Sequence, residues 1–172
     1  LIFNNPDITV RTQAGKYFKR PGLVKIYESQ KILTLPGDAI AGRQVFSTRC
    51  STCHKAAGEG KTIGPELTAI GKKFDNATLL DAIINPSAAI VFGYDPWLIT
   101  TKDGETLYGF LIADGKQNIT IKDVNGQKHV IAVNKIANRE KQNKSMMPEP
   151  SASGITEQEL ANIITYLRSL KG

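Results

Sequence analysis

Sulfur and imidazole are scarce in this chain of 172 residues, which has two cysteines, two methionines and two histidines. With so few cysteines, a network of stabilising disulfides is excluded. No apolar run approaches the roughly 18 residues that a membrane-spanning helix requires. Hydrophobic residues make up 41% and charged residues 22% of the chain, as in an ordinary globular protein. The length fits one domain, or one domain with an appendage.

Both cysteines fall in one five-residue motif, Cys50-Ser51-Thr52-Cys53-His54. C-x-x-C-H is the attachment signature of a c-type haem. Two thiols a short turn apart can each form a thioether with a haem vinyl group, and the imidazole that follows can bind the iron axially. The motif therefore predicts one covalently bound haem c.

Two other interpretations of the cysteine pair are open. C-x-x-C is also a redox disulfide motif, but that motif typically follows a strand and opens a helix in an α/β pattern, which this chain does not show. A closed zinc site needs four ligands. Since His129 is the one histidine outside the motif, carboxylates would have to complete such a site. Haem attachment is the best-supported interpretation.

The formal net charge is +6, which two haem propionates would reduce to about +4. A positive surface can steer an acidic redox partner, although ordinary solubility also accounts for the charge. The basic residues are scattered and no aromatic platform accompanies them, so nucleic-acid binding is not expected.

The motif also has a consequence for location. Covalent haem attachment takes place on the oxidising side of the bacterial membrane, so we expect a periplasmic or extracytoplasmic protein. The chain begins at Leu1 rather than methionine, and we expect a processed form or a part of a longer protein.

Helical periodicity appears on both sides of the motif. The expected helices are residues 5–20, 39–50, 77–84 and 156–170. Asp38 is the expected N-cap of the helix that runs into Cys50, and Thr156 with Glu159 forms a capping box for the last helix. Residues 23–35 form a connector of ambiguous type.

A second segment is rich in β-branched and aromatic residues. The expected strands are residues 97–101, 106–112, 118–124 and 128–133. Between them lie Asp103-Gly104, Asp114-Gly115 and Asn125-Gly126, which are strong hairpin signals. The sequence predicts a four-stranded antiparallel meander, followed by a polar loop at residues 134–144.

The order of these features resembles class I cytochrome c. The matching residues are Gly42 and Phe46, Cys50 to His54, Gly64-Pro65-Glu66-Leu67, Met147-Pro148 and Tyr166-Leu167. The resemblance implies a mainly α fold, the cytochrome c fold, with an inserted antiparallel β-meander at about residues 93–133.

More narrowly, the chain is similar to haem-binding domains at the C-terminus of large secreted dehydrogenase-like proteins. The shared features are Asn85-Pro86-Ser87, Gly93-Tyr94, Asp103-Gly104 and Ser145-Met146-Met147-Pro148. This resemblance implies a redox partner protein or a fused dehydrogenase domain. Residues 37–172 would be the cytochrome c domain, and residues 1–36 a helical extension or linker that ends a preceding helical-repeat domain.

The resemblance also assigns the axial ligands of the iron. His54 would be the proximal ligand, with the Pro65 carbonyl bonded to its other ring nitrogen. The family pattern places the sixth ligand directly before proline, which selects Met147, while Met146 would cover the haem edge or an apolar surface. His129 is the rival ligand, but a lone histidine in a strand more often forms hydrogen bonds than binds metal.

Apolar side chains should line the haem. The residues assigned to this pocket are Pro65, Leu67, Ile70, Phe74, Leu79, Leu80 and Ile83. Tyr94 and Trp97 could pack on the haem or donate to a propionate, and could equally be core anchors.

With both axial positions filled, the iron has no open site for a substrate, so the predicted function is one-electron transfer. The chain would have no catalytic residues and would act as an electron-transfer domain, alone or within a larger oxidoreductase. Two alternatives stay open. A peroxidase-like haem enzyme needs a vacant distal position, and a haem-based sensor needs an exchangeable sixth ligand.

Overall fold

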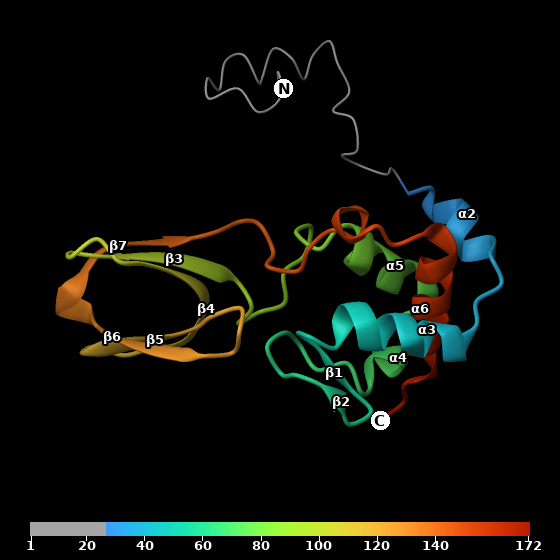
Figure 1. The fold of residues 1–172 in the computed structure, drawn as a ribbon, viewed down its shortest axis with the longest axis horizontal. Helices are drawn as coiled ribbons and strands as arrows, with labels where there is room; N and C mark the ends of the chain where they lie inside the picture. The colour runs from blue at the N-terminus through green and yellow to red at the C-terminus, as the bar shows by residue number, and fades with distance from the viewer. Residues whose placement is uncertain (1–26) are drawn as a thin grey trace, which may run out of the picture.

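The computed structural model describes residues 27–172, which form a helical half and a β-sheet half lying side by side (Figure 1). The expected helix at residues 5–20 lies outside the described residues. The helices of the first half are α2 (Ser29–Thr34), α3 (Ala39–Val45), α4 (Ile70–Lys73), α5 (Asn76–Ile84) and α6 (Glu157–Ser169). None of the described helices is long and apolar enough to cross a membrane.

Side-chain caps fix where the main helices begin. The Asp38 carboxylate accepts hydrogen bonds from two backbone amides in the first turn of α3, and Asp75 caps α5 through the Thr78 amide. Thr156 and Glu159 form the capping box of α6. These caps satisfy amides that a helix start leaves without partners, and they confirm three helix starts expected from the sequence.

The helical half is organised around the crossing of α3 and α6. A Cβ atom at Gly42 would lie 2.0 Å from the carbonyl oxygen of Asn162, so only glycine allows the two backbones to approach this closely. One turn later, the buried Phe46 ring packs against Tyr166 with 5.6 Å between ring centroids. Ile163 is also buried on this face of α6. Gly42 and Phe46 therefore contact the C-terminal helix near Ile163 and Tyr166.

The second half is one antiparallel sheet of five strands. They are β3 (Pro96–Thr101), β4 (Thr106–Asp114), β5 (Asn118–Lys122), β6 (Lys128–Ala132) and β7 (Ile136–Lys141), in the order β6-β5-β4-β3-β7. In Figure 1 the sheet curls so that β3 and β7 lie opposite β5 and β6, with β4 between them. Irregular register in β3 and β4 accompanies this bend, as bulges increase local twist.

The fifth strand corrects the sequence prediction. Residues 134–144 were expected to form a polar loop, yet most of them form β7, which pairs with β3 along the sheet edge. Only Ile136 of β7 is partly buried, and the other five residues are exposed. Because the strand is held by backbone pairing with a distant segment, it lacks the apolar alternation that marks a strand in sequence.

The expected mainly α fold is wrong, because only 35% of the described residues are helical. The β segment is a half of the structure with its own core rather than a minor insertion on a helical body. Ile99, Ile119 and Ile121 are fully buried between the curled parts of the sheet, together with Ile131. A separate cluster, which includes Ile32, Phe46 and Leu160, forms the core of the helical half.

The start of the described chain packs into the helical half. Ile32 of α2 is 1% exposed within that core, and the Tyr27 hydroxyl donates to the carbonyl oxygen of Ile155 at 2.6 Å. The ambiguous connector at residues 23–35 therefore contains a helix. The domain boundary expected at residue 36 stays a prediction.

The crossing at Gly42 generates a stability prediction. Gly42→Leu should lower the free energy of unfolding by about 1–3 kcal/mol or more, because the side chain would force α3 and α6 apart. Gln44→Ala, on the exposed side of α3, is the matched control and should stay within about 0.5 kcal/mol. Urea denaturation of both variants measures the difference, and a Gly42→Leu protein as stable as the control would contradict the close crossing.

Candidate functional site

The C-x-x-C-H motif lies at the end of a continuous helical segment. α3 passes into a π-helical turn, η2 (Phe46–Cys50), in which the Ser51 amide donates to the carbonyl oxygen of Phe46 at 2.9 Å. The amides of Cys53 and His54 then donate to the carbonyl oxygen of Cys50 at 3.1 and 2.9 Å. This tight turn brings both thiols and the imidazole together, as haem attachment requires.

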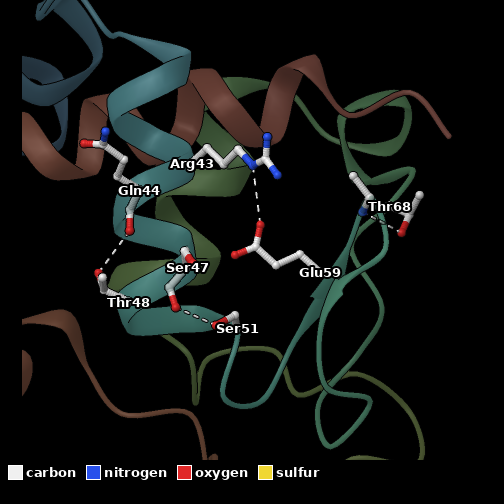
Figure 2. Close-up of polar contacts among 8 residues, drawn as sticks. Arg43, Gln44, Ser47, Thr48, Ser51, Glu59 and Thr68 are labelled. Atoms are coloured by element: carbon white, nitrogen blue, oxygen red, sulfur yellow. Dashed lines mark hydrogen bonds and ion pairs between the residues drawn. The ribbon is translucent and has the colours of Figure 1, made fainter.

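Hydroxyl groups brace the helical turn that precedes the motif. Figure 2 shows the Ser51 hydroxyl donating to the carbonyl oxygen of Ser47, at 2.6 Å, and the Thr48 hydroxyl donating to that of Gln44, at 3.1 Å. The guanidinium of Arg43 lies 3.4 Å from Glu59 on the short hairpin that follows the motif, formed by β1 (Lys55–Ala56) and β2 (Glu59–Gly60). This exposed ion pair contributes little to stability. The turn before the motif is therefore stabilised mainly by the hydrogen bonds of the Ser51 and Thr48 hydroxyls.

The loop after the hairpin folds back on the motif. The amides of Ile63 and Gly64 donate to the carbonyl oxygen of Cys53 at 3.0 and 2.7 Å. A Cβ atom at Gly60 would lie 2.1 Å from the His54 carbonyl oxygen, and Gly60 has a positive φ of 94°. Glycine is therefore required both for the turn and for the close approach.

The imidazole of His54 is fixed by the following segment. Its Nδ1 donates to the carbonyl oxygen of Pro65 at 2.7 Å, which confirms the hydrogen bond expected from the resemblance. A Cβ atom at Gly64 would lie 2.8 Å from Cε1 of the ring, so glycine also leaves room for the imidazole. Because a carbonyl only accepts, the proton belongs on Nδ1 and Nε2 presents a lone pair, the arrangement found in metal-binding histidines.

The protonation states suit ligation rather than redox disulfide chemistry. Burial lowers the pKa of His54, although its bond to Pro65 opposes the shift, so the ring is neutral near pH 7. Burial, and then the charge of Cys53, raises the pKa of the Cys50 thiol to about 11. Redox cysteines of the thioredoxin type have lowered thiol pKa values, so this environment argues against that alternative.

The zinc alternative also finds no support. No group of three or more histidine, cysteine, aspartate and glutamate side chains that could hold a metal ion occurs within residues 27–172. Cys50 and Cys53 are free thiols. A haem needs two thiols and one axial imidazole from this segment, and the donors present fit that group.

The residues assigned to the haem pocket differ in their surroundings. Leu80 is buried in the helical core, and Leu67 and Ile70 pack partly buried against the same core as Cys50. Leu79 and Ile83 belong to this cluster too, whereas Phe74 is 43% exposed. The structure thus brings most of the assigned apolar residues into the core next to the motif, and their contact with haem stays a prediction.

The two aromatic residues expected near the haem make their ring contacts with residues of the sheet. Tyr94 packs edge-on against Phe110, with 5.4 Å between ring centroids. The Trp97 ring lies 5.4 Å from the guanidinium carbon of Arg139. Phe110 is buried, and Trp97 also packs partly buried against the core of the sheet, so both aromatic residues fit core anchors, the alternative left open from the sequence.

Met147 lies in the segment that connects the sheet to α6. Its side chain is partly buried, and its amide donates to the Ser145 hydroxyl at 3.1 Å. Met146 is partly buried as well. The Ser87 hydroxyl accepts a hydrogen bond from the Ser145 amide at 3.0 Å. The sequence named Ser87 only as part of the Asn85-Pro86-Ser87 feature and did not predict this bond.

The rival ligand, His129, is engaged elsewhere. It lies on β6, and its Nε2 is 2.9 Å from Oδ2 of Asp123 in the turn between β5 and β6. The hydrogen bond from His129 is the main cause that lowers the pKa of Asp123. This pairing gives His129 a role within the sheet.

Comparisons with known proteins agree with the geometry of the motif. A family model described as cytochrome c matches residues 39–110, from α3 into β4. Cytochrome c from Arabidopsis thaliana is 51% identical over 43 residues, which cover 24% of this chain and 38% of that protein. Cytochrome c from Cochliobolus lunatus is 54% identical over 39 residues, covering 22% of this chain and 36% of that protein.

These matches support a c-type cytochrome. The chain spans less than two fifths of the length of these two relatives. The matched residues include the attachment motif and Pro65 but end before Met147. The family match therefore covers the attachment motif but not the Met147 segment, and both axial ligands stay predictions.

The position of His129 generates a spectroscopic prediction. His129→Ala should leave the low-spin haem spectrum unchanged, because the imidazole is paired with Asp123 in the sheet. His54→Ala is the matched comparison and should abolish the normal low-spin spectrum by removing the proximal ligand. Absorption spectra of the two purified variants check this, and loss of the low-spin signature in His129→Ala would make that histidine the ligand.

Proposed function

We propose that this protein transfers single electrons through one covalently bound haem c. Cys50 and Cys53 provide the thioether bonds, and His54 and Met147 are the axial ligands. The observation that carries the proposal is the C-x-x-C-H turn in which Pro65 holds the His54 ring, with Nε2 left as the only ring nitrogen able to bind iron.

The haem supplies the one-electron couple of its iron, and the chain controls access to it. His54 is neutral and oriented before any ligand binds, because burial lowers its pKa and Pro65 fixes its tautomer. Met147 would bind the iron together with His54 and would leave no position for substrate or peroxide. A thioether ligand favours ferrous iron, so the reduction potential is higher than with two histidine ligands.

The electron donor is a dehydrogenase, either a partner protein or a domain of the same polypeptide. The resemblance to C-terminal haem domains of dehydrogenase-like proteins supports this assignment. The net charge of +6 suits an acidic redox partner. Covalent haem attachment supports a periplasmic or extracytoplasmic location in a bacterium.

The attachment chemistry has a direct test. Protein made with the cytochrome c maturation machinery should keep one haem per chain after denaturation and extraction with acidified acetone, because thioether bonds survive this treatment. The Cys50→Ala, Cys53→Ala double variant should lose its haem under the same conditions. Mass spectrometry of the extracted chain gives the stoichiometry, and complete loss of haem from the unmodified chain would overturn the proposal.

The sixth ligand is tested by the two adjacent methionines. Met147→Ala should lower the reduction potential and allow imidazole or cyanide to bind at least about tenfold more tightly, since it removes an iron bond that external ligands must otherwise displace. Met146→Ala is the matched control and should change both much less.

Redox potentiometry and ligand titration measure these effects. Reversed results would assign the ligand to Met146. If neither variant differs from the unmodified protein, methionine ligation is wrong, and a haem enzyme or sensor with an open site becomes the better explanation.

A further inference from the structure

Two chain segments connect the sheet to the helical half, and they are joined to each other. Residues 85–95 lead from α5 into β3, and residues 142–149 lead from β7 back towards α6. In Figure 1 these segments run next to each other between the halves. On the sheet side, the Gln142 amide donates to the carbonyl oxygen of Pro96 at 2.8 Å. On the helical side, the Ser145 amide donates to the Ser87 hydroxyl at 3.0 Å.

The second junction leads directly to Met147. The Ser145 hydroxyl accepts the amide hydrogen of Met147 at 3.1 Å, and this bond is partly buried. A serine side chain that accepts from the amide two residues later stabilises a turn. Pro148 fixes the backbone angle immediately after Met147. Both sides of the methionine are therefore restrained, and the restraint extends through Ser145 to Ser87.

Ser87 is itself well placed to anchor this chain of bonds. It is exposed and lies three residues after the end of α5, next to the buried Pro86, on the helical side of the junction. Ser145 is 58 residues further along the sequence. The bond thus ties the segment that bears Met147 to the helical half, across the whole inserted sheet.

We propose that Ser87 and Ser145 are positioning residues that hold Met147 in place as the sixth ligand. This inference rests on the proposed ligation by Met147. Neither hydroxyl contacts the haem in this role. Ser145 shapes the turn at Met147, and Ser87 fixes that turn relative to the helices that carry His54.

The expected effect follows from competition between Met147 and external ligands. A neutral hydrogen bond of this kind has a modest net worth, so losing one should raise the affinity of the ferric protein for imidazole about fivefold. The reduction potential should fall, and the long-wavelength charge-transfer band of methionine-bound ferric haem should weaken in proportion.

The experiment compares four serine variants of the haem-loaded protein. Ser87→Ala and Ser145→Ala should show the imidazole effect and the weaker band. Ser87→Thr keeps a hydroxyl and should behave like the unmodified protein. Ser153→Ala is the matched control, because Ser153 lies a few residues after Met147 in the 3-10 turn η4 (Pro150–Ser153) and is not part of the contact between Ser87 and Ser145. Equal effects in Ser153→Ala, or no rescue by Ser87→Thr, would overturn the proposal.

Met147→Ala in the same titration separates this inference from the proposed function. If Met147→Ala does not increase imidazole affinity, the assignment of the sixth ligand fails. If Met147→Ala increases it but Ser87→Ala and Ser145→Ala do not, only the positioning role fails.

A measurement on the unmodified protein decides the case if the alanine variants do not fold. Amide hydrogen exchange reports whether the Ser145 and Met147 amides are hydrogen-bonded. We expect both to exchange more slowly than the exposed amides of the neighbouring loop. Exchange at the rate of an unprotected peptide would overturn the proposal.

Discussion

The crossing of α3 and α6 determines where the haem-attachment motif can lie. Gly42 lets the two helices meet, and α3 continues through η2 into Cys50 without a break. α6 also packs closely against the segment after the motif. A Cβ atom at Gly71 would lie only 2.5 Å from the carbonyl oxygen of Arg168, so the two backbones nearly touch there. The Arg168 guanidinium also donates to the carbonyl oxygen of Phe74 at 2.8 Å. One helix therefore positions the chain segments on both sides of the motif.

The sheet can be inserted between α5 and α6 because its chain leaves and returns at the same place. β3 begins the sheet, β7 ends it, and the two strands pair along the sheet edge. The Gln142 amide bonds to Pro96, so the entry and exit of residues 96–141 are adjacent. A unit with its own core and adjacent ends disturbs its host little. The helical core therefore has to accommodate only two adjacent chain crossings between α5 and α6.

Local signals in the sequence were reliable, and long-range pairing was not. The caps of α3, α5 and α6 and the Pro65 bond to His54 all depend on residues close in sequence. The turns at Gly104 and Gly126 have φ values of 90° and 85°, as Asp-Gly and Asn-Gly hairpins require. β7 was not predicted, because a polar edge strand forms through backbone pairing with a distant strand and has no apolar alternation of its own. The predicted sheet was therefore one strand too small. The bond between Ser87 and Ser145 was not predicted, because the two residues lie 58 positions apart.

The two sides of the proposed haem site differ in the same way: one depends on contacts close in sequence and the other on distant contacts. The His54 imidazole is fixed by Pro65, 11 residues along the chain, within one compact loop. The Met147 segment is fixed through Ser145 by Ser87, and that bond can form only when the intervening sheet has folded and returned the chain. Loss of the sheet would leave the Pro65 bond to His54 in place, although it would remove the Lys122 bond to the Thr62 carbonyl oxygen, and it would release the Met147 segment. Under the proposed ligation, the sheet would influence Met147 through the closure of its two ends.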